Sequence, residues 1–309
     1  MNKRILTLIT GIIIFIYVIY SIGAQEILTA FAKVDFVFLL YAFIVFIASI
    51  VVRIKKWSLM SGSVKLELDS NQLTGFYLKT RLMGQITPFR AGEALPAFFK
   101  PKDKEKFFSI TVADRFYEGF TTFAIGLFSL YFFFSKLPNK ANLVAFAIVF
   151  LLLGLLFFLA FTTKSGYSVL EKGLGKTKVS GSLDKYLTSL RTVLSNEGKL
   201  RILLITIAAS AIDVIIYKFV FNAVGIDITI LNAALSMAFL SVIIVLSPTP
   251  GGIGIAEAGY ILLAGRLQLA NLAQIGSFLI TLRVLNLLMT STLLAVTSKI
   301  SGRQGYLNA

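Results

Sequence analysis

Two apolar stretches of this chain are each interrupted by a phrase that contains proline and glycine and ends in a carboxylate. The first phrase is Thr87-Pro88-Phe89-Arg90-Ala91-Gly92-Glu93, and the second is Thr249-Pro250-Gly251-Gly252-Ile253-Gly254-Ile255-Ala256-Glu257. Lipid offers no hydrogen bonds to an interrupted backbone, so a break at membrane depth persists only inside protein or along a wet cavity. Two breaks at corresponding places of a multi-span chain are typical of a carrier's substrate site.

The composition supports a multi-span membrane protein. Of the 309 residues, 57% are hydrophobic, and the mean hydropathy is +0.84. The chain has no Cys and no His, which removes disulfides, thiolate chemistry, the common zinc sites and imidazole catalysis. We therefore expect no metal, no cofactor and no enzymatic activity.

The formal net charge of +15 does not indicate a nucleic-acid partner. The basic residues cluster beside hydrophobic segments, as the positive-inside rule requires, and no RNA- or DNA-binding motif appears. Such clusters favour contact with an anionic cytoplasmic leaflet. We expect a multi-pass protein of the plasma membrane.

The hydropathy pattern predicts an all-α chain with about six full transmembrane helices. The expected spans are 5–20, 34–52, 110–134, 142–161, 202–224 and 272–296. The first could instead be a signal peptide, but it is long for that role and further spans follow it. Basic residues around Arg53 close the second span in this interpretation.

The two interrupted stretches, about 71–99 and 230–264, are predicted to be re-entrant helical hairpins. With both termini in the cytoplasm, this topology leaves few basic residues outside; they are Lys33, Lys136, Lys140 and Arg266. The first hairpin then enters from the cytoplasm and the second from outside. Residues 34–134 and 202–296 thereby form an inverted repeat within one transmembrane domain, 1–309.

The polar segment 162–201 joins the two repeats. Leu183, Tyr186, Leu187, Leu190 and Leu194 recur in it at helical spacing. This pattern predicts a short amphipathic helix, which lies on the cytoplasmic leaflet or packs on the protein itself.

The first hairpin carries charges that need partners at membrane depth. Arg90 and Glu93 follow Pro88, and an ionised group there is paired, wet or functional. Gly92 permits a close approach of the backbone to a ligand. Together with a helix N-terminus, Arg90 would form a phosphate cradle; alternatively, Arg90 and Glu93 pair only to seal the hairpin.

The start of the 110–134 span adds three more charges. Asp114 and Glu118 share a helix face, and Arg115 lies three residues before Glu118. Arg115 is the expected partner of Glu93 or of a substrate phosphate. Near a membrane boundary these side chains could instead be solvated.

The second hairpin has a break that no continuous helix tolerates. Glu257 follows the break, and Arg283, in the last span, is its natural partner. Asp213, deep in the 202–224 span, is expected to join Glu257 and Arg283 in a second charged cluster, which either binds substrate or only holds helices together. The residues of the break are Pro248, Pro250, Gly251, Gly252 and Gly254.

These motifs resemble those of the flippase-like integral membrane family, the family of the transmembrane region of lysylphosphatidylglycerol synthase. The resemblance covers nearly the whole chain. Phe89 stands where the family more often has Gly. The first matching motif is Pro88, Arg90, Ala91, Gly92 and Glu93 with Arg115 downstream; the second is Pro250, Gly251, Gly252, Ile253 and Gly254 with Glu257 and Arg283.

The resemblance implies translocation of lipid. No soluble aminoacyl-transferase domain is present in the sequence, so we expect no lipid synthesis. The leading hypothesis is a flippase or scramblase for an anionic lipid, with Arg90, Arg115 and Arg283 neutralising phosphate. The alternatives are a secondary transporter of a small anion, a membrane enzyme, and a non-catalytic partner of a lipid-linked glycosyltransferase or lipid-modifying enzyme. An oligomer is compatible with each.

Overall fold

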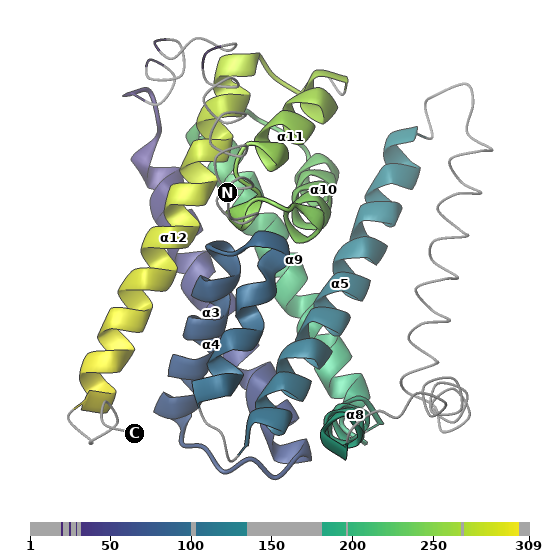
Figure 1. The fold of residues 1–309 in the computed structure, drawn as a ribbon. Coiled ribbons are helices and arrows are strands. Elements are labelled where there is room, and N and C mark those ends of the chain that lie inside the picture. Colours follow the sequence, from purple (N-terminus) through teal and green to yellow (C-terminus); the bar gives the residue numbers. More distant parts are fainter. Residues whose placement is uncertain are drawn as a thin grey trace, which may run out of the picture.

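The computed structural model describes residues 32–99, 103–134, 181–195, 197–266 and 269–302, together with the isolated residues 20, 25 and 29. Every regular element in these ranges is a helix, as the sequence predicts (Figure 1). The expected spans 5–20 and 142–161 lie outside the described residues. The elements are α3 (Phe36–Ser63), α4 (Ser70–Gln85), η1 (Pro88–Phe99), α5 (Lys104–Phe134), α8 (Gly181–Ser195), α9 (Lys199–Ala223), α10 (Ile230–Leu246), η2 (Pro250–Gly252), α11 (Ile255–Arg266) and α12 (Leu272–Gly302).

Three of the described helices are long and apolar enough to cross a membrane. They are Phe36–Ser63, Lys199–Ala223 and Leu272–Lys299, at the positions expected for the spans 34–52, 202–224 and 272–296. Helix α5 occupies the position of the 110–134 span. Its 31 residues would extend about 46 Å, but it carries the charges of Asp114, Arg115 and Glu118.

The helix that contains the second predicted span is longer than that span. Helix α3 does not close at Arg53 but continues to Ser63. Arg53 and Lys56 are 4% and 0% exposed, and the Trp57 ring beside them is 1% exposed. The helix continues because carboxylates on neighbouring helices compensate these charges, so the residues need no water.

Both interrupted stretches form helical hairpins that turn back inside the molecule. In Figure 1, α4 rises from the end of the molecule that holds α8 and the chain reverses at mid-height. The chain of α10 and α11 reverses at a similar depth from the other end. Helix α4 has 16 residues, about 24 Å, whereas α3 has 28, about 42 Å.

The two hairpin tips contact each other. Phe89 N donates to Ser247 O at 2.8 Å, and Gly251 N donates to Thr87 O at 3.3 Å. Each tip thus satisfies part of the broken backbone of the other.

Side-chain caps fix where the first helix of each hairpin begins. Asp69 accepts a hydrogen bond from Gln72 N at 2.8 Å at the start of α4. Thr229 accepts one from Asn232 N at 3.2 Å at the start of α10. Such caps satisfy one of the free N–H groups of a first helical turn.

Each helix of one half of the chain packs on a helix of the other half in three main pairs. Helix α3 runs along α9, α4 packs on α12, and α10 packs on α5. Each hairpin therefore lies against the last long helix of the other half of the chain. Stacked rings at Phe221 and Phe278, 3.7 Å between centroids, fix α9 against α12.

Helix α8 is the amphipathic helix expected within 162–201. Val193 and Leu194 are buried, and the Tyr186 ring meets Phe108 of α5 edge-on at 5.3 Å. Ser109 Oγ also donates to Tyr186 O at 3.1 Å. The apolar face of α8 therefore packs on the protein, which is one of the two alternatives that the sequence left open.

Candidate functional site at the hairpin junction

The first hairpin tip is held by the hydroxyl of Thr87. Its Oγ1 donates to Met83 O at 2.7 Å and accepts from Gly92 N at 2.7 Å. In the second tip the hydroxyls of Ser247 and Thr249 hydrogen-bond each other at 2.8 Å. Short polar side chains thus replace the water that a broken helix would otherwise need.

The two tips turn through the same backbone conformation. Phe89 and Arg90 have φ of 51° and 54°, while Gly251 and Gly252 have φ of 57° and 76°. This left-handed region suits glycine and is uncommon for other residues. Phe89, the departure from the family's usual Gly, therefore occupies a position where glycine is the less strained residue.

Gly251 is also required by space. A Cβ on this residue would overlap Gln85 O at the end of α4. The two tips approach so closely that no side chain fits between them. Gly252, the next residue, has Ile244 and Ala256 atoms 3.2 Å from its Cβ position.

Glu93 lies between two arginines. Its Oε1 is 2.6 Å from Arg90 Nε, and its Oε2 is 2.6 Å from Arg115 Nε. Gly84 of α4 makes room for it, because a Cβ there would overlap the Glu93 side chain. The expected Glu93–Arg115 pair is therefore present, alongside the internal Arg90–Glu93 pair.

The second hairpin repeats this arrangement with one arginine. Arg283 of α12 forms an ion pair with Glu257 and donates from Nη1 to Gly251 O at 3.2 Å. Glu257 Oε2 in turn accepts from Gly254 N at 2.7 Å. Arg283 thus links the carboxylate, the tip and α12, as the predicted Glu257–Arg283 pair requires.

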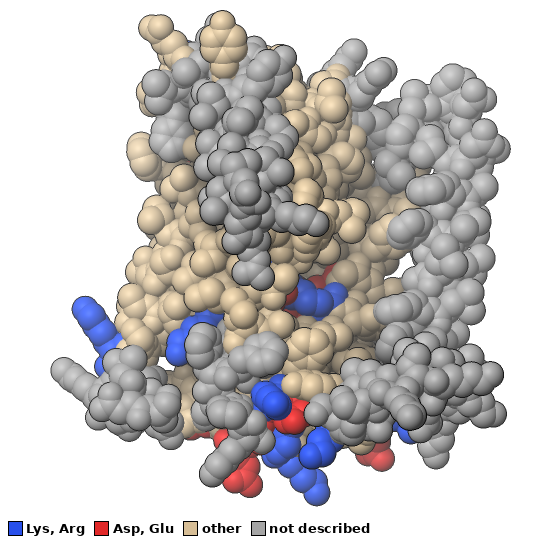
Figure 2. All heavy atoms as spheres, in the orientation of Figure 1, with Lys and Arg blue, Asp and Glu red and all other residues tan. Residues whose placement is uncertain are grey.

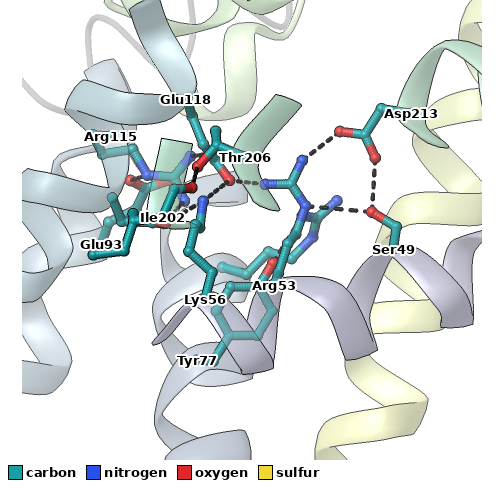
Figure 3. A network of polar contacts seen from close by, with 12 residues as sticks. Ser49, Arg53, Lys56, Tyr77, Glu93, Arg115, Glu118, Ile202, Thr206 and Asp213 are labelled. Atoms are coloured by element: carbon teal, nitrogen blue, oxygen red, sulfur yellow. Dashed lines mark hydrogen bonds and ion pairs between the residues drawn. The ribbon is translucent and has the colours of Figure 1, made fainter. Parts of the chain in front are cut away.

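Behind Glu93, ion pairs continue into α3. Arg115 contacts Glu118 at 2.5 Å and Asp114 at 3.2 Å. Lys56 contacts Asp114 at 2.5 Å. It also contacts Glu118 at 3.1 Å (Figure 3). Asp114 is 0% exposed, so the interpretation as a solvated boundary charge is wrong for Asp114.

Asp213 belongs to the network of ion pairs behind Glu93. The expectation that it lies in a second cluster with Glu257 and Arg283 is therefore wrong. Arg53 forms ion pairs with both Glu118 and Asp213, and Ser49 Oγ donates to Asp213 Oδ1 at 2.8 Å (Figure 3). The contacts of Asp213 are with α3, because α3 and α9 pack along each other.

The network is balanced in charge, with four cations and four carboxylates that contact one another. From the sequence, two of these cations, Arg53 and Lys56, are expected just beyond the end of the span. Their spacing is a sequence signal that they belong to the network, since Ser49, Arg53 and Lys56 share one face of α3. The members of the network are Arg53, Lys56, Arg90, Arg115, Glu93, Asp114, Glu118 and Asp213.

The charged side chains nearest the hairpin tips are not fully enclosed. The side chains of Arg90, Arg115 and Arg283 are 20%, 24% and 24% exposed. Figure 2 shows a group of blue and red atoms near the middle of the visible face, with further basic atoms toward its left edge and most of the charged atoms at the end that holds α8. These arginines can therefore meet a ligand, whereas Lys56 cannot.

The arrangement suits binding of an anion more than coordination of a metal. Within the described ranges, no three Asp or Glu side chains gather in a way that could hold a metal ion. The carboxylates instead face basic groups. Arginines that fork around a carboxylate present the same geometry to a phosphate.

The family model described as Lysylphosphatidylglycerol synthase TM region matches residues 4–293. The chain belongs to this family. The resemblance carried by the two hairpin motifs is thereby confirmed. Members of the lysylphosphatidylglycerol synthase transmembrane family are membrane proteins linked to lipid handling. A comparison with curated proteins finds no match.

Proposed function

We propose that this protein moves the headgroup of an anionic lipid across the membrane through the junction of its two hairpins. The observation that carries the proposal is the junction itself, where both tips meet at mid-height beside partly exposed arginines. The headgroup would belong to a phospholipid, an aminoacyl-phospholipid or a polyprenyl-phosphate carrier. The acyl or prenyl tails would remain in the bilayer.

In this proposal the hairpins are re-entrant and the halves 34–134 and 202–296 form an inverted repeat. The matching left-handed turns and the matching Glu93–Arg115 and Glu257–Arg283 pairs support the relationship. The charged end that holds α8 would face the cytoplasm by the positive-inside rule. The first hairpin would then open inward and the second outward, as alternating access requires.

The carboxylates and arginines would exchange partners during transport. Without substrate, Glu93 pairs with Arg90 and Arg115, and Glu257 pairs with Arg283. A headgroup phosphate entering the junction would compete for the same guanidinium groups. Arginine suits this exchange because its planar fork binds either anion with two parallel hydrogen bonds.

The proposal describes transport without covalent chemistry, in the plasma membrane and without a cofactor. The anionic cytoplasmic leaflet would attract the basic end of the protein. A glycosyltransferase or lipid-modifying enzyme could supply or receive the lipid, and an oligomer is compatible with this arrangement.

A secondary transporter of a small soluble anion is the second candidate. The partly exposed Arg283 and Arg115 would bind a soluble phosphate by the same geometry as a lipid phosphate. The two functions differ in whether the substrate carries a tail.

The direct test is translocation of fluorescent lipids in proteoliposomes of the purified protein, measured as the fraction that a membrane-impermeant quencher reaches. We expect movement of an anionic lipid that falls on Arg115→Gln and on Glu257→Gln. The matched control is Lys299→Gln, an exposed charge at the end of α12. Absence of lipid movement by the folded protein, with uptake of soluble phosphate, would favour the small-anion transporter.

A further inference from the structure

Arg81, in the fourth turn of α4, is a half-buried basic side chain that neither the motifs nor the ion-pair network includes. It donates to Asn286 Oδ1 at 3.1 Å and to Tyr77 Oη at 3.3 Å. Its guanidinium lies 5.2 Å from the centroid of the Phe46 ring. All three partners are uncharged.

The other interior cations differ from Arg81 in having carboxylate partners. Arg53, Lys56, Arg90 and Arg115 contact the four carboxylates of the network, and Arg283 contacts Glu257. Among the described residues, Arg81 has no carboxylate within ion-pairing distance, and its Nε is buried without an acceptor. An uncompensated charge at membrane depth is costly and indicates a functional group.

Arg81 lies close to the first hairpin tip. It shares a face of α4 with Gly84, three residues further on, and Gly84 contacts the Glu93 side chain that pairs with Arg90. One turn further along α4, Gln85 Nε2 donates to Thr290 Oγ1 at 3.4 Å, while Gln85 Oε1 is buried without a partner. A polar seam between α4 and α12 therefore leads from the tips toward Arg81.

We propose that Arg81 and Arg90 together bind the headgroup phosphate, and that the site is built for a phosphodiester with one negative charge. The inference rests on the proposed function and assigns the substrate class of the same site. The network and the Glu257–Arg283 pair are each neutral, so Arg81 leaves an excess of one positive charge. One phosphodiester neutralises that excess, whereas a lipid diphosphate adds further negative charge that no described cation balances.

The test compares native protein with Arg81→Gln, Arg81→Lys and the control Lys79→Gln. Lys79 lies two residues from Arg81 on α4, so it points to the opposite side of the helix, and it is exposed. Binding of short-chain phosphatidylglycerol, phosphatidylcholine and a lipid diphosphate is measured by thermal shift in detergent. Translocation of the labelled forms is measured in proteoliposomes, and emission of the single tryptophan, Trp57, reports folding.

We expect native protein to bind and move phosphatidylglycerol in preference to the other two lipids. Arg81→Gln should weaken phosphatidylglycerol binding about tenfold or more, as loss of a charge-assisted hydrogen bond does. Arg81→Lys should restore part of the affinity, and Lys79→Gln should change nothing. A competition with soluble glycerophosphoglycerol, a singly charged phosphodiester without tails, separates the headgroup from the tail: displacement of phosphatidylglycerol by this compound supports recognition of the phosphodiester.

Two results would overturn the inference. Equal affinity of native protein and a folded Arg81→Gln variant for phosphatidylglycerol would remove Arg81 from the site. Preference of native protein for the diphosphate would refute the single-charge class. If native protein binds phosphatidylglycerol through Arg81 but moves no lipid, the inference about the binding site holds and the proposed translocation fails.

Discussion

The contact between the hairpin tips makes Gly251 the glycine least able to accept a side chain among those that the structure describes. Alanine there would adopt a φ near 57°, at about 1–2 kcal/mol for a left-handed residue. Its Cβ would also overlap Gln85 O, a backbone atom that cannot rotate away, and overpacking costs about 1–3 kcal/mol. We expect Gly251→Ala to lower the free energy of unfolding by about 2–5 kcal/mol.

Phe89 provides the matched comparison, because it has the same backbone conformation in the other tip. Its side chain is 56% exposed, so Phe89→Gly removes strain with little loss of packing. The gain is offset by the greater freedom of glycine in the unfolded chain, and the net change should stay within about 1 kcal/mol.

Both variants can be measured by titrating the detergent-solubilised protein with dodecyl sulfate and following tryptophan emission. Trp57 is the single tryptophan and is buried against Tyr77, 5.4 Å between ring centroids. If Gly251→Ala unfolds at the same dodecyl sulfate concentration as the native protein, the close contact of the tips is refuted. A larger loss for Phe89→Gly than for Gly251→Ala would refute the assignment of strain.

Two further predictions concern the ion pairs. Glu93→Gln leaves Arg90 and Arg115 without their shared carboxylate, and we expect a loss of about 3–5 kcal/mol in the same titration; a change below 1 kcal/mol would contradict this. Lys56→Met and Asp114→Asn should each destabilise strongly, because the pair is fully buried. The double variant should lose less than the sum by about 0.5–3 kcal/mol, and strict additivity would show that the two side chains are not coupled.

The hairpins and their charge pairs could be predicted from the sequence because the signal is local. A Pro–Gly break followed by a carboxylate identifies a tip, and a lone Arg283 in an apolar helix requires a partner. Glu257 was the natural candidate and is the residue that Arg283 contacts. The contact between the two tips, by contrast, joins residues far apart in sequence.

The network around α3 could not be predicted in the same way. Arg53 and Lys56 end an apolar run, and that position is typical of a membrane boundary. Only the packing of α3 on α5 and α9 places carboxylates beside them, so their burial depends on helix arrangement. The same arrangement assigns Asp213 to Arg53 instead of to Glu257.

The central claim is that transport requires the two hairpin tips to separate. The absence of native cysteine allows a clean test with Phe89→Cys and Leu246→Cys, two exposed positions. Leu246 adjoins Ser247, whose carbonyl accepts from Phe89 N across the junction at 2.8 Å. A short thiol-cleavable crosslinker would join the pair, and lipid movement in proteoliposomes would be measured before and after reduction. We predict that the crosslink abolishes movement, that reduction restores it, and that each single variant moves lipid with or without reagent. Full lipid movement by the crosslinked protein would contradict the account.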